Sequence, residues 1–440
     1  MPVLKTVTDF VLVLNYEAWR RDDKLIDDLV ALKADTLTLD EAHHGKTMTT
    51  STALGIQRLA YTPNECPKCG TDQVERESQG GNWTDRAFCK ICDHVSRVWE
   101  ATTVKNVLAM TGTPILNKPQ ELFPQLKLIQ PQTFSTINDF LRDFCYMNEN
   151  RHWLWKPGAE SNIIKKIGHR YIARDRKSAG IIIPPATPVL HLITKDEFKI
   201  SHPLQYKAYE QVREYAQLVL DEDVTMSMPI FLSVLMRMRQ VLAWPNAIEL
   251  KKTDPDTKIT EVVSRLNVHE SIKLDKAEEL IREINEEGER VVLFSQFKAP
   301  LEILQERLGR RVAIYNGDTP DFLRREIQLD FDPKTVTSEP LYDAVLCNYR
   351  AAGEGLNFNA ASQMIILDEE WNPGKQSQAY GRIDRLGQTR ETTIHTIRVE
   401  KTADQWMADL IQEKSEMIDG FETQAGLFQK MMDGLKNGDL

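Results

Sequence analysis

Apolar residues recur along the first part of the chain at two spacings, one typical of short buried strands and one of helices. Residues 7–15, 36–39 and 104–110 have the compact, β-prone composition of strands, whereas 16–33 and 48–59 carry apolar residues at the spacing of an amphipathic helix. Strands that alternate with helices form parallel sheets, because each helix returns the chain to the edge where the strand began. The pattern therefore predicts a parallel α/β domain.

The same alternation returns near residue 271. Helices are predicted at 273–286 and 298–308, and strands at 290–294, 312–315, 344–346 and 364–367. A further helix is predicted to carry Arg382 and Arg385, about one turn apart on one face. This series predicts a second parallel α/β domain that repeats the first in outline.

The sequence between these two series is mainly helical in pattern. Residues 119–222 are predicted to be largely helical, and the proline-rich run Pro184–Pro188 is the best candidate for an interdomain linker. The polar stretch 250–262 is predicted to be a loop. The basic cluster Arg170–Lys177 has two interpretations, a solvated face or a surface that meets phosphate.

Length and composition agree with a two-domain globular protein. A chain of 440 residues exceeds one hydrophobic core, so two domains with insertions are expected. The chain has no apolar run of membrane-spanning length, and its N-terminus lacks a secretory pattern. We therefore expect no membrane contact and a cytoplasmic location, in a bacterium or in the host cell of a virus. Because the net charge is −10, any binding of nucleic acid is expected to use a local basic groove.

Four of the six cysteines form two CxxC pairs, Cys66 with Cys69 and Cys89 with Cys92. Nineteen mostly polar residues separate the pairs. This segment has too few apolar side chains to form a core of its own. Four thiolates at this spacing predict one tetrahedral, structural zinc ion, since they leave no open position for catalysis. A redox pair or unpaired cysteines are the alternatives, and His94 is a possible substitute ligand.

Two strand ends carry candidate chemistry in the first domain. The strand 36–39 ends in Asp40 and Glu41, which either form a solvated acidic turn or deliver carboxylates to the ligand-binding edge of a sheet. The strand 104–110 ends in Thr111-Gly112-Thr113-Pro114, which is either a simple turn or a bend that places hydroxyls over the same edge. The basic segment around Arg382 and Arg385 favours the second interpretation of the acidic pair.

Several motifs together resemble the Swi/Snf-type DNA translocases of helicase superfamily 2, in the order seen in that family. They are Asp40-Glu41-Ala42-His43, Thr111–Asn117, Val291–Phe297, the loop Gly353-Glu354-Gly355-Leu356-Asn357, Trp371-Asn372-Pro373 and Gln378–Gln388. The resemblance covers roughly residues 7 to 415, and its specificity lies in the joint occurrence of the motifs.

The resemblance implies two RecA-like lobes that bind ATP between them and duplex DNA across them. The expected parts are a partial first lobe at 1–130 with a zinc ribbon at 62–98, helical insertions and an interlobe linker at 131–270, a second lobe at 271–415, and a C-terminal helical tail at 416–440.

For the hydrolytic site, the resemblance implies that Asp40 holds Mg²⁺ through water and that Glu41 polarises the attacking water. Arg382 and Arg385 would stabilise the charge that develops on the γ-phosphate, a role that suits a delocalised cation. The remaining candidate nucleotide contacts are Gly353, Gly355 and Gln378.

For movement along DNA, the resemblance implies that Thr111 and Thr113 couple hydrolysis to lobe movement. Ser295, Asn348 and Arg350 would grip the DNA backbone without reading sequence. Asn348 and Tyr349 stand where the family usually has Ser-Thr or a similar pair.

The family's phosphate-binding loop, a glycine-rich turn with Gly-Lys-Thr, is not found N-terminal to these motifs. Gly45-Lys46-Thr47 is a poor substitute, because Asp40 stands where a glycine has to let amides wrap the phosphates. We therefore expect the first lobe to be N-terminally truncated, and a partner polypeptide or a separate segment to supply the phosphate loop.

These observations leave two functions open. The first is the motor part of an ATP-driven duplex DNA translocase. The second is a non-hydrolysing DNA-binding or scaffold protein derived from such a motor. A restriction-type motor subunit is not supported, because the sequence has no nuclease-like carboxylate cluster.

Overall fold

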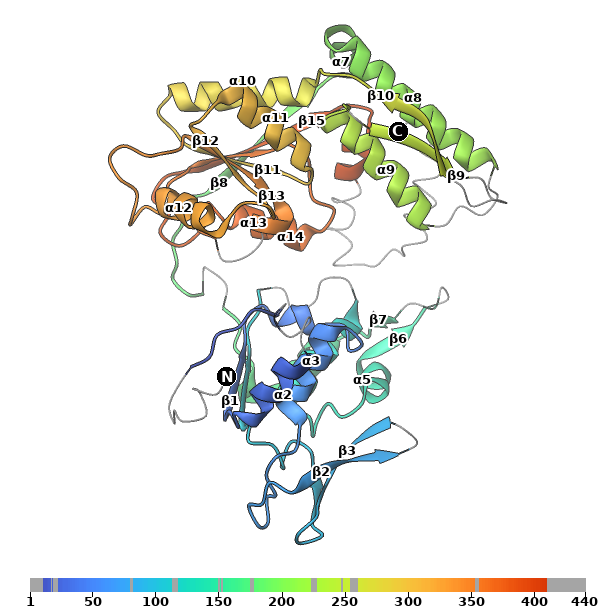
Figure 1. Cartoon of the computed structure of the whole chain (residues 1–440), viewed down its shortest axis with the longest axis vertical. Coiled ribbons are helices and arrows are strands. Elements are labelled where there is room, and N and C mark those ends of the chain that lie inside the picture. Colours follow the sequence, from blue (N-terminus) through green and yellow to red (C-terminus); the bar gives the residue numbers. More distant parts are fainter. Residues whose placement is uncertain are drawn as a thin grey trace. The chain divides into compact units, whose positions relative to one another are not determined.

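The computed structural model divides into two compact units, Met1–Ala173 and Arg174–Leu440 (Figure 1). It describes residues 11–16, 18, 23–79, 82–112, 118–148, 151, 153–174, 178–222, 228–246, 248–253, 260–352 and 356–409. The predicted α/β class is confirmed, whereas the predicted boundaries at residues 130, 270 and 415 stay predictions.

The first unit is built around two parallel strands, β1 (Thr36–Leu39) and β5 (Asn106–Ala109). Helices α2 (Asp23–Ala31) and α3 (Ser51–Tyr61) flank β1 in sequence, as the apolar spacing predicts. Thr50 begins α3 because its hydroxyl accepts the backbone N–H of Ala53 at 3.3 Å.

Two smaller sheets and a group of helices complete this unit. The segment predicted to be a zinc ribbon forms a three-stranded antiparallel sheet, β2 (Val74–Gln79), β3 (Asn82–Cys89) and β4 (Val95–Arg97). The later elements are α4 (Phe123–Ile129), α5 (Ile137–Phe144), the antiparallel pair β6 (Cys145–Met147) and β7 (Trp153–Trp155), and α6 (Ala159–Ile167).

The second unit contains a six-stranded parallel sheet in the order β12-β13-β11-β14-β15-β8. Its strands are β8 (Ala186–Ile193), β11 (Val291–Ser295), β12 (Val312–Tyr315), β13 (Ala344–Asn348), β14 (Gln363–Ile366) and β15 (Thr392–Val399). Every residue of β11 and β13 is buried, because both faces of a parallel sheet are covered.

Helices cover both faces of this sheet (Figure 1). The helices of this unit are α7 (Lys195–Ser201), α8 (Pro203–Glu222), α9 (Met228–Ala243), α10 (Ile272–Glu286), α11 (Lys298–Leu308), α12 (Asp321–Phe331), α13 (Tyr349–Ala352) and α14 (Pro373–Tyr380). Val291 and Leu293 pack on the side of α10 and α11, whereas Val292 and Phe294 pack on the side of α12 and α14. The alternation follows from the two-residue period of a strand.

The prediction of a linker at Pro184–Pro188 is wrong in its second half. Residues 186–193 form β8, which pairs with β15 over its whole length at the edge of the sheet. Pro188 is tolerated there because an edge strand has one side on which no N–H is needed.

Three other local predictions also need correction. The stretch 250–262 is not a loop, because β9 (Ile248–Thr253) and β10 (Thr260–Leu266) pair as antiparallel strands. The largely helical stretch 119–222 also contains strands β6, β7 and β8. Residues 11–15 of the predicted first strand have no regular secondary structure, and residues 7–10 lie outside the described residues.

Among the described residues no helix is both long and apolar enough to span a bilayer.

Candidate functional site

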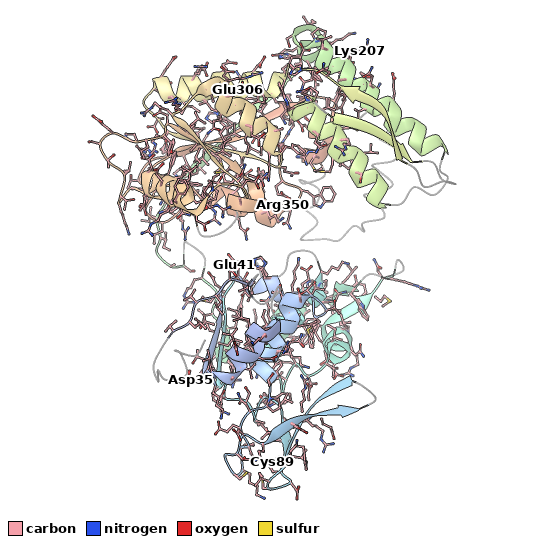
Figure 2. The ribbon with its side chains drawn as sticks, in the orientation of Figure 1. Asp35, Glu41, Cys89, Lys207, Glu306 and Arg350 are labelled. Carbon is pink, nitrogen blue, oxygen red and sulfur yellow. The ribbon has the colours of Figure 1, made fainter. Side chains whose placement is uncertain are left out.

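The acidic pair lies directly after β1, where the sequence predicts it (Figure 2). Asp40 is exposed, and its Oδ1 accepts the backbone N–H of Glu41 at 3.0 Å. Glu41 has a left-handed backbone, with φ of 48° and ψ of 52°. Such a conformation is uncommon outside glycine and tends to occur at functional sites.

Thr111 approaches this pair from the end of β5. Its Oγ1 lies 3.4 Å from Glu41 Oε2 and 3.0 Å from His43 Nδ1, which is itself 3.2 Å from the same carboxylate oxygen. The parallel pairing of β1 and β5 creates this meeting, since it brings both strand ends to one edge. The structure thus joins Glu41 and His43 of one predicted motif to Thr111 of another, about 70 positions later.

Gly45 and Lys46 do not form a phosphate-binding loop here. Gly45 ends a short 3-10 helix, Ala42–Gly45, and a Cβ on it would lie 3.0 Å from Ile56 Cδ1. The Lys46 ammonium lies 3.2 Å from Glu121 Oε1. A packed glycine and a paired lysine agree with the rejection of this segment as the phosphate loop.

The predicted DNA contacts lie at the carboxyl ends of β11 and β13. Ser295 and Asn348 are buried: the Ser295 hydroxyl donates to Asp368 Oδ2 at 2.5 Å, and Asn348 Nδ2 donates to the carbonyl oxygen of Gln296 at 2.8 Å. Arg350 is exposed on α13 (Figure 2). Its backbone N–H donates to Asn348 Oδ1 at 3.2 Å. In this structure Arg350 alone of the three presents its side chain to solvent.

The periodicity predicts that Arg382 and Arg385 lie on one helical face. The structure shows that they do not. Helix α14 ends at Tyr380, Gly381 follows as its cap, and both arginines lie in the turns beyond. They still converge, because Arg382 Nη1 and Arg385 Nη1 both donate to the carbonyl oxygen of Leu356, at 3.1 and 3.0 Å. Leu356 belongs to the motif Gly353–Asn357.

Four further site residues were predicted. Gln378 lies half-buried on α14. Thr113, Gly353 and Gly355 lie outside the described residues.

Asp368 is a further polar residue at this edge of the sheet, outside the residues predicted for the site. It is buried two residues after the end of β14 and also accepts the backbone N–H of Gln296 at 2.8 Å. Burial raises the pKa of this carboxyl, and the positive charges of Arg239 and Lys273 oppose the rise. The available signal was the one that marked Asp40, an acid immediately after a buried strand.

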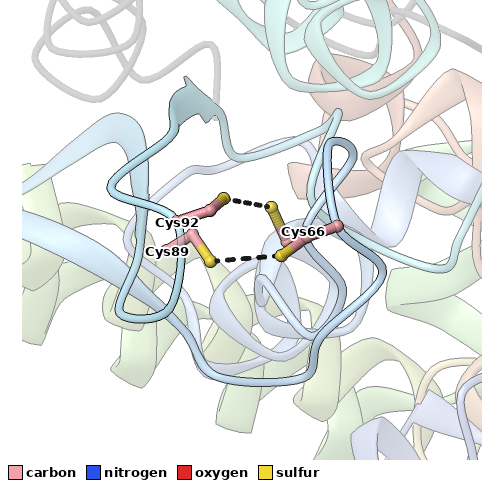
Figure 3. A group of neighbouring side chains, drawn as sticks. Cys66, Cys89 and Cys92 are labelled. Atoms are coloured by element: carbon pink, nitrogen blue, oxygen red, sulfur yellow. Dashed lines mark hydrogen bonds between the residues drawn. The ribbon is translucent and has the colours of Figure 1, made fainter.

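The four CxxC cysteines come together as predicted (Figure 3). Their sulfur atoms all lie within 4.8 Å of one another, and the Sγ–Sγ distances are 3.7 Å for Cys66–Cys92 and for Cys69–Cys89. A tetrahedron with Zn–S bonds of about 2.3 Å has edges of about 3.8 Å, so this arrangement fits zinc.

The two halves of this cysteine site have the same backbone. In each, the first cysteine N–H donates to a carbonyl five residues later, Cys66 to Thr71 at 2.7 Å and Cys89 to His94 at 3.0 Å. The residue after each second cysteine has positive φ, 70° at Gly70 and 53° at Asp93. His94 therefore contributes its carbonyl oxygen to the knuckle, and the metal-compatible group consists of the four cysteines.

Comparison with known proteins yields one domain match and a set of relatives. The helicase conserved C-terminal domain matches residues 273–387. Protein CHROMATIN REMODELING 4 of Arabidopsis thaliana is 24% identical over 331 residues, which are 75% of this chain and 14% of that protein. Chromatin-remodeling ATPase INO80 of Neurospora crassa is 33% identical over 183 residues, 40% of this chain and 9% of that protein. The chain therefore spans a small part of these relatives.

A solved structure is also similar. The Sulfolobus solfataricus SWI2/SNF2 ATPase core in complex with dsDNA aligns with 91% of this chain and 70% of its own, at 19% identity and a TM-score of 0.39. The domain match and the two relatives agree with the resemblance noted from the motifs.

Proposed function

We propose that this chain, a relative of the Swi/Snf-type DNA translocases of helicase superfamily 2, takes part in ATP-driven movement along duplex DNA. The observation that carries the proposal is the meeting of Glu41, His43 and Thr111 at the carboxyl ends of β1 and β5. The Thr111 hydroxyl lies beside the Glu41 carboxylate, so a ligand bound at the acidic pair would change the contacts of Thr111 at the end of the neighbouring strand.

Roles for the hydrolytic residues follow from their chemistry. Asp40 is the candidate for holding Mg²⁺, because its side chain is exposed and Mg²⁺ favours carboxylate and water oxygens. Glu41 is the candidate general base toward water. Arg382 and Arg385 are the candidates for stabilising phosphoryl-transfer charge, with Gln378, Gly353 and Gly355 as further nucleotide contacts.

The DNA contacts are proposed at the carboxyl edge of the second sheet. Arg350 is the direct contact to phosphate, because its side chain is exposed. Ser295 and Asn348 support this contact through their buried hydrogen bonds. Thr113 completes the coupling segment together with Thr111. Zinc is the proposed occupant of the four-cysteine site, where it stabilises the ribbon.

Hydrolysis also needs a phosphate-binding lysine, and Lys46 is paired with Glu121. We propose that a partner polypeptide or a separate segment supplies it. The test is DNA-stimulated phosphate release by the chain, alone and mixed with a polypeptide that carries Gly-Lys-Thr. Glu41→Gln should abolish release, and Asp35→Asn, an exposed acid just before β1, should leave it unchanged.

The scaffold alternative keeps one supporting observation, the paired Lys46. It predicts duplex DNA binding without phosphate release under any pairing. Phosphate release that persists in the Glu41→Gln variant would contradict the assignment of Glu41 as the general base.

A further inference from the structure

Arg239 is among the largest fully buried side chains of the described chain, with 1% of its surface exposed. It lies on α9, in the helical section that precedes the second α/β series. A buried guanidinium is costly unless its charge and its donors are satisfied, and an apolar residue of similar volume often stabilises a core equally well. The presence of arginine at this position therefore calls for a role beyond filling space.

The guanidinium reaches across to two segments that follow strands of the sheet. Nη1 donates to Gln296 Oε1 at 3.3 Å, and Nη2 donates to the carbonyl oxygen of Glu369. The nearest carboxylate oxygen, Oδ1 of Asp368, lies 3.9 Å away, so Arg239 forms no close bidentate ion pair with it. Its contacts orient a side-chain amide and a backbone carbonyl.

The same segments are joined to one another. Gln296 Nε2 also donates to the carbonyl oxygen of Glu369, at 2.9 Å, and the Gln296 N–H donates to Asp368 Oδ1 at 2.8 Å. Asn348 then binds the carbonyl oxygens of Ser295 and Gln296, and its Oδ1 accepts the N–H of Arg350. One continuous hydrogen-bond network therefore runs from α9 to the exposed Arg350.

A branch of the network leads toward the arginine pair. The N–H of Glu370 donates to Oε1 of Gln376 on α14 at 2.8 Å, and the Tyr349 hydroxyl donates to the same oxygen at 3.1 Å. Helix α14 in turn precedes the turns that carry Arg382 and Arg385. The segment 368–370 thus contacts α9, the β11 end and α14.

We propose that Arg239 is a positioning residue that fixes Gln296 and segment 368–370 against α9, and thereby couples helix α9 to the sheet edge that carries Arg350. The part that concerns DNA rests on the proposed function. The structural part does not, because it concerns the order of named backbone amides.

The first test measures amide hydrogen exchange in the full chain. Arg239→Lys keeps a positive charge and removes the planar fork. We expect exchange at the Gln296 and Glu370 amides to become at least about tenfold faster, the scale of one lost hydrogen bond, while the β12–β13 ladder stays protected. Gln296→Ala removes the other end of the contact and should speed exchange at Glu370 in the same way.

Arg290→Lys is the matched control. Arg290 is another buried arginine of this unit, and its fork binds Asp330 and the carbonyl oxygen of Tyr342 near the start of β11. We expect faster exchange at the Leu341 and Tyr342 amides, which donate to Asp330, and no change at Gln296. A uniform increase across the sheet in Arg239→Lys, or none at Gln296 and Glu370, would overturn the proposal.

The second test is a double-mutant cycle on duplex DNA binding. Arg350→Gln should weaken binding and lower the salt slope by about one unit. If Arg239 acts through Arg350, Arg239→Lys weakens duplex DNA binding several-fold in the otherwise wild-type chain. The same substitution then has little further effect on binding in the Arg350→Gln background. Fully additive effects would overturn the coupling. A wild-type chain that binds no duplex would refute the proposed function, and the exchange result would still decide the positioning role.

Discussion

Loss of one exposed cysteine of the candidate zinc site should loosen the core of the first unit as well as the ribbon. Cys69 is exposed, so Cys69→Ser removes one candidate metal ligand and almost no packing. Cys66 and Cys89, in contrast, belong to the hydrophobic cluster that also contains Leu39 of β1 and Ile56 of α3. The ribbon thus shares its core with the strand that precedes the acidic pair.

The magnitude follows from what the ribbon buries in that cluster. Val74 and Val98 are both buried there, and complete burial of a valine contributes about 1.5–3 kcal/mol. Their release would remove about 3–6 kcal/mol, and Ala87 would add to it. Because whole domains are stable by only about 5–15 kcal/mol, this loss reaches the β1–β5 pair.

The assay combines metal analysis with amide exchange. Wild type should bind about one zinc ion per chain, and Cys69→Ser should bind much less. Exchange at Met110, whose N–H donates to the Leu39 carbonyl oxygen, should accelerate, while the β11–β14 ladder serves as the internal reference. Lys68→Ser, an exposed change in the same knuckle, should have neither effect. A variant that loses zinc but protects Met110 like wild type would refute the shared-core reasoning.

Three further predictions concern single sites. Gly70→Ala should lower the free energy of unfolding by about 1 kcal/mol and Asp93→Gly should raise it by about as much, because both positions have positive φ. Thermal unfolding measures both changes, and shifts of the same sign would contradict the symmetry of the knuckles. Asp330→Asn should cost about 3–5 kcal/mol in denaturant unfolding, since it leaves the buried Arg290 uncompensated; a loss below about 1 kcal/mol would contradict the importance of this pair. Burial, and then the neighbouring His191, lowers the pKa of His395 to about 4, so the unfolded chain takes up a proton near pH 6.5 that the folded chain accepts only near pH 4. Stability should therefore fall as the pH drops through this window, by about 1–2 kcal/mol after allowance for partial exposure, and His395→Gln should reduce that pH dependence in urea titrations.

Much of the candidate site could be predicted because its signals are local. An acidic pair after β1, threonine after β5 and two CxxC pairs are visible in the sequence, and parallel pairing then brings the strand ends to one edge. The roles assigned to Asp40, Glu41, Arg382 and Arg385 came from the family resemblance, and they stay predictions.

The predictions that failed depended on distant partners. The second half of the proline-rich run became the start of β8 because β15, some 200 residues later, offers an edge to pair with. The stretch 250–262 overlaps β9 and β10 because these two segments pair with each other, and the polar composition of the stretch does not reveal that partner. The arginine pair converges on Leu356 through turns, a geometry that helical periodicity cannot express.

The sequence by itself determined the α/β alternation, the order of the motifs and the four-cysteine site, because these depend on spacing along the chain. Only the tertiary structure decided that Ser295 and Asn348 point inward, that Asp368 accepts from β11, and that Arg239 joins α9 to the same edge. The physical reason is that a polar side chain is buried or exposed according to which donors and acceptors the rest of the fold brings to it, and those come from residues 50 to 130 positions away.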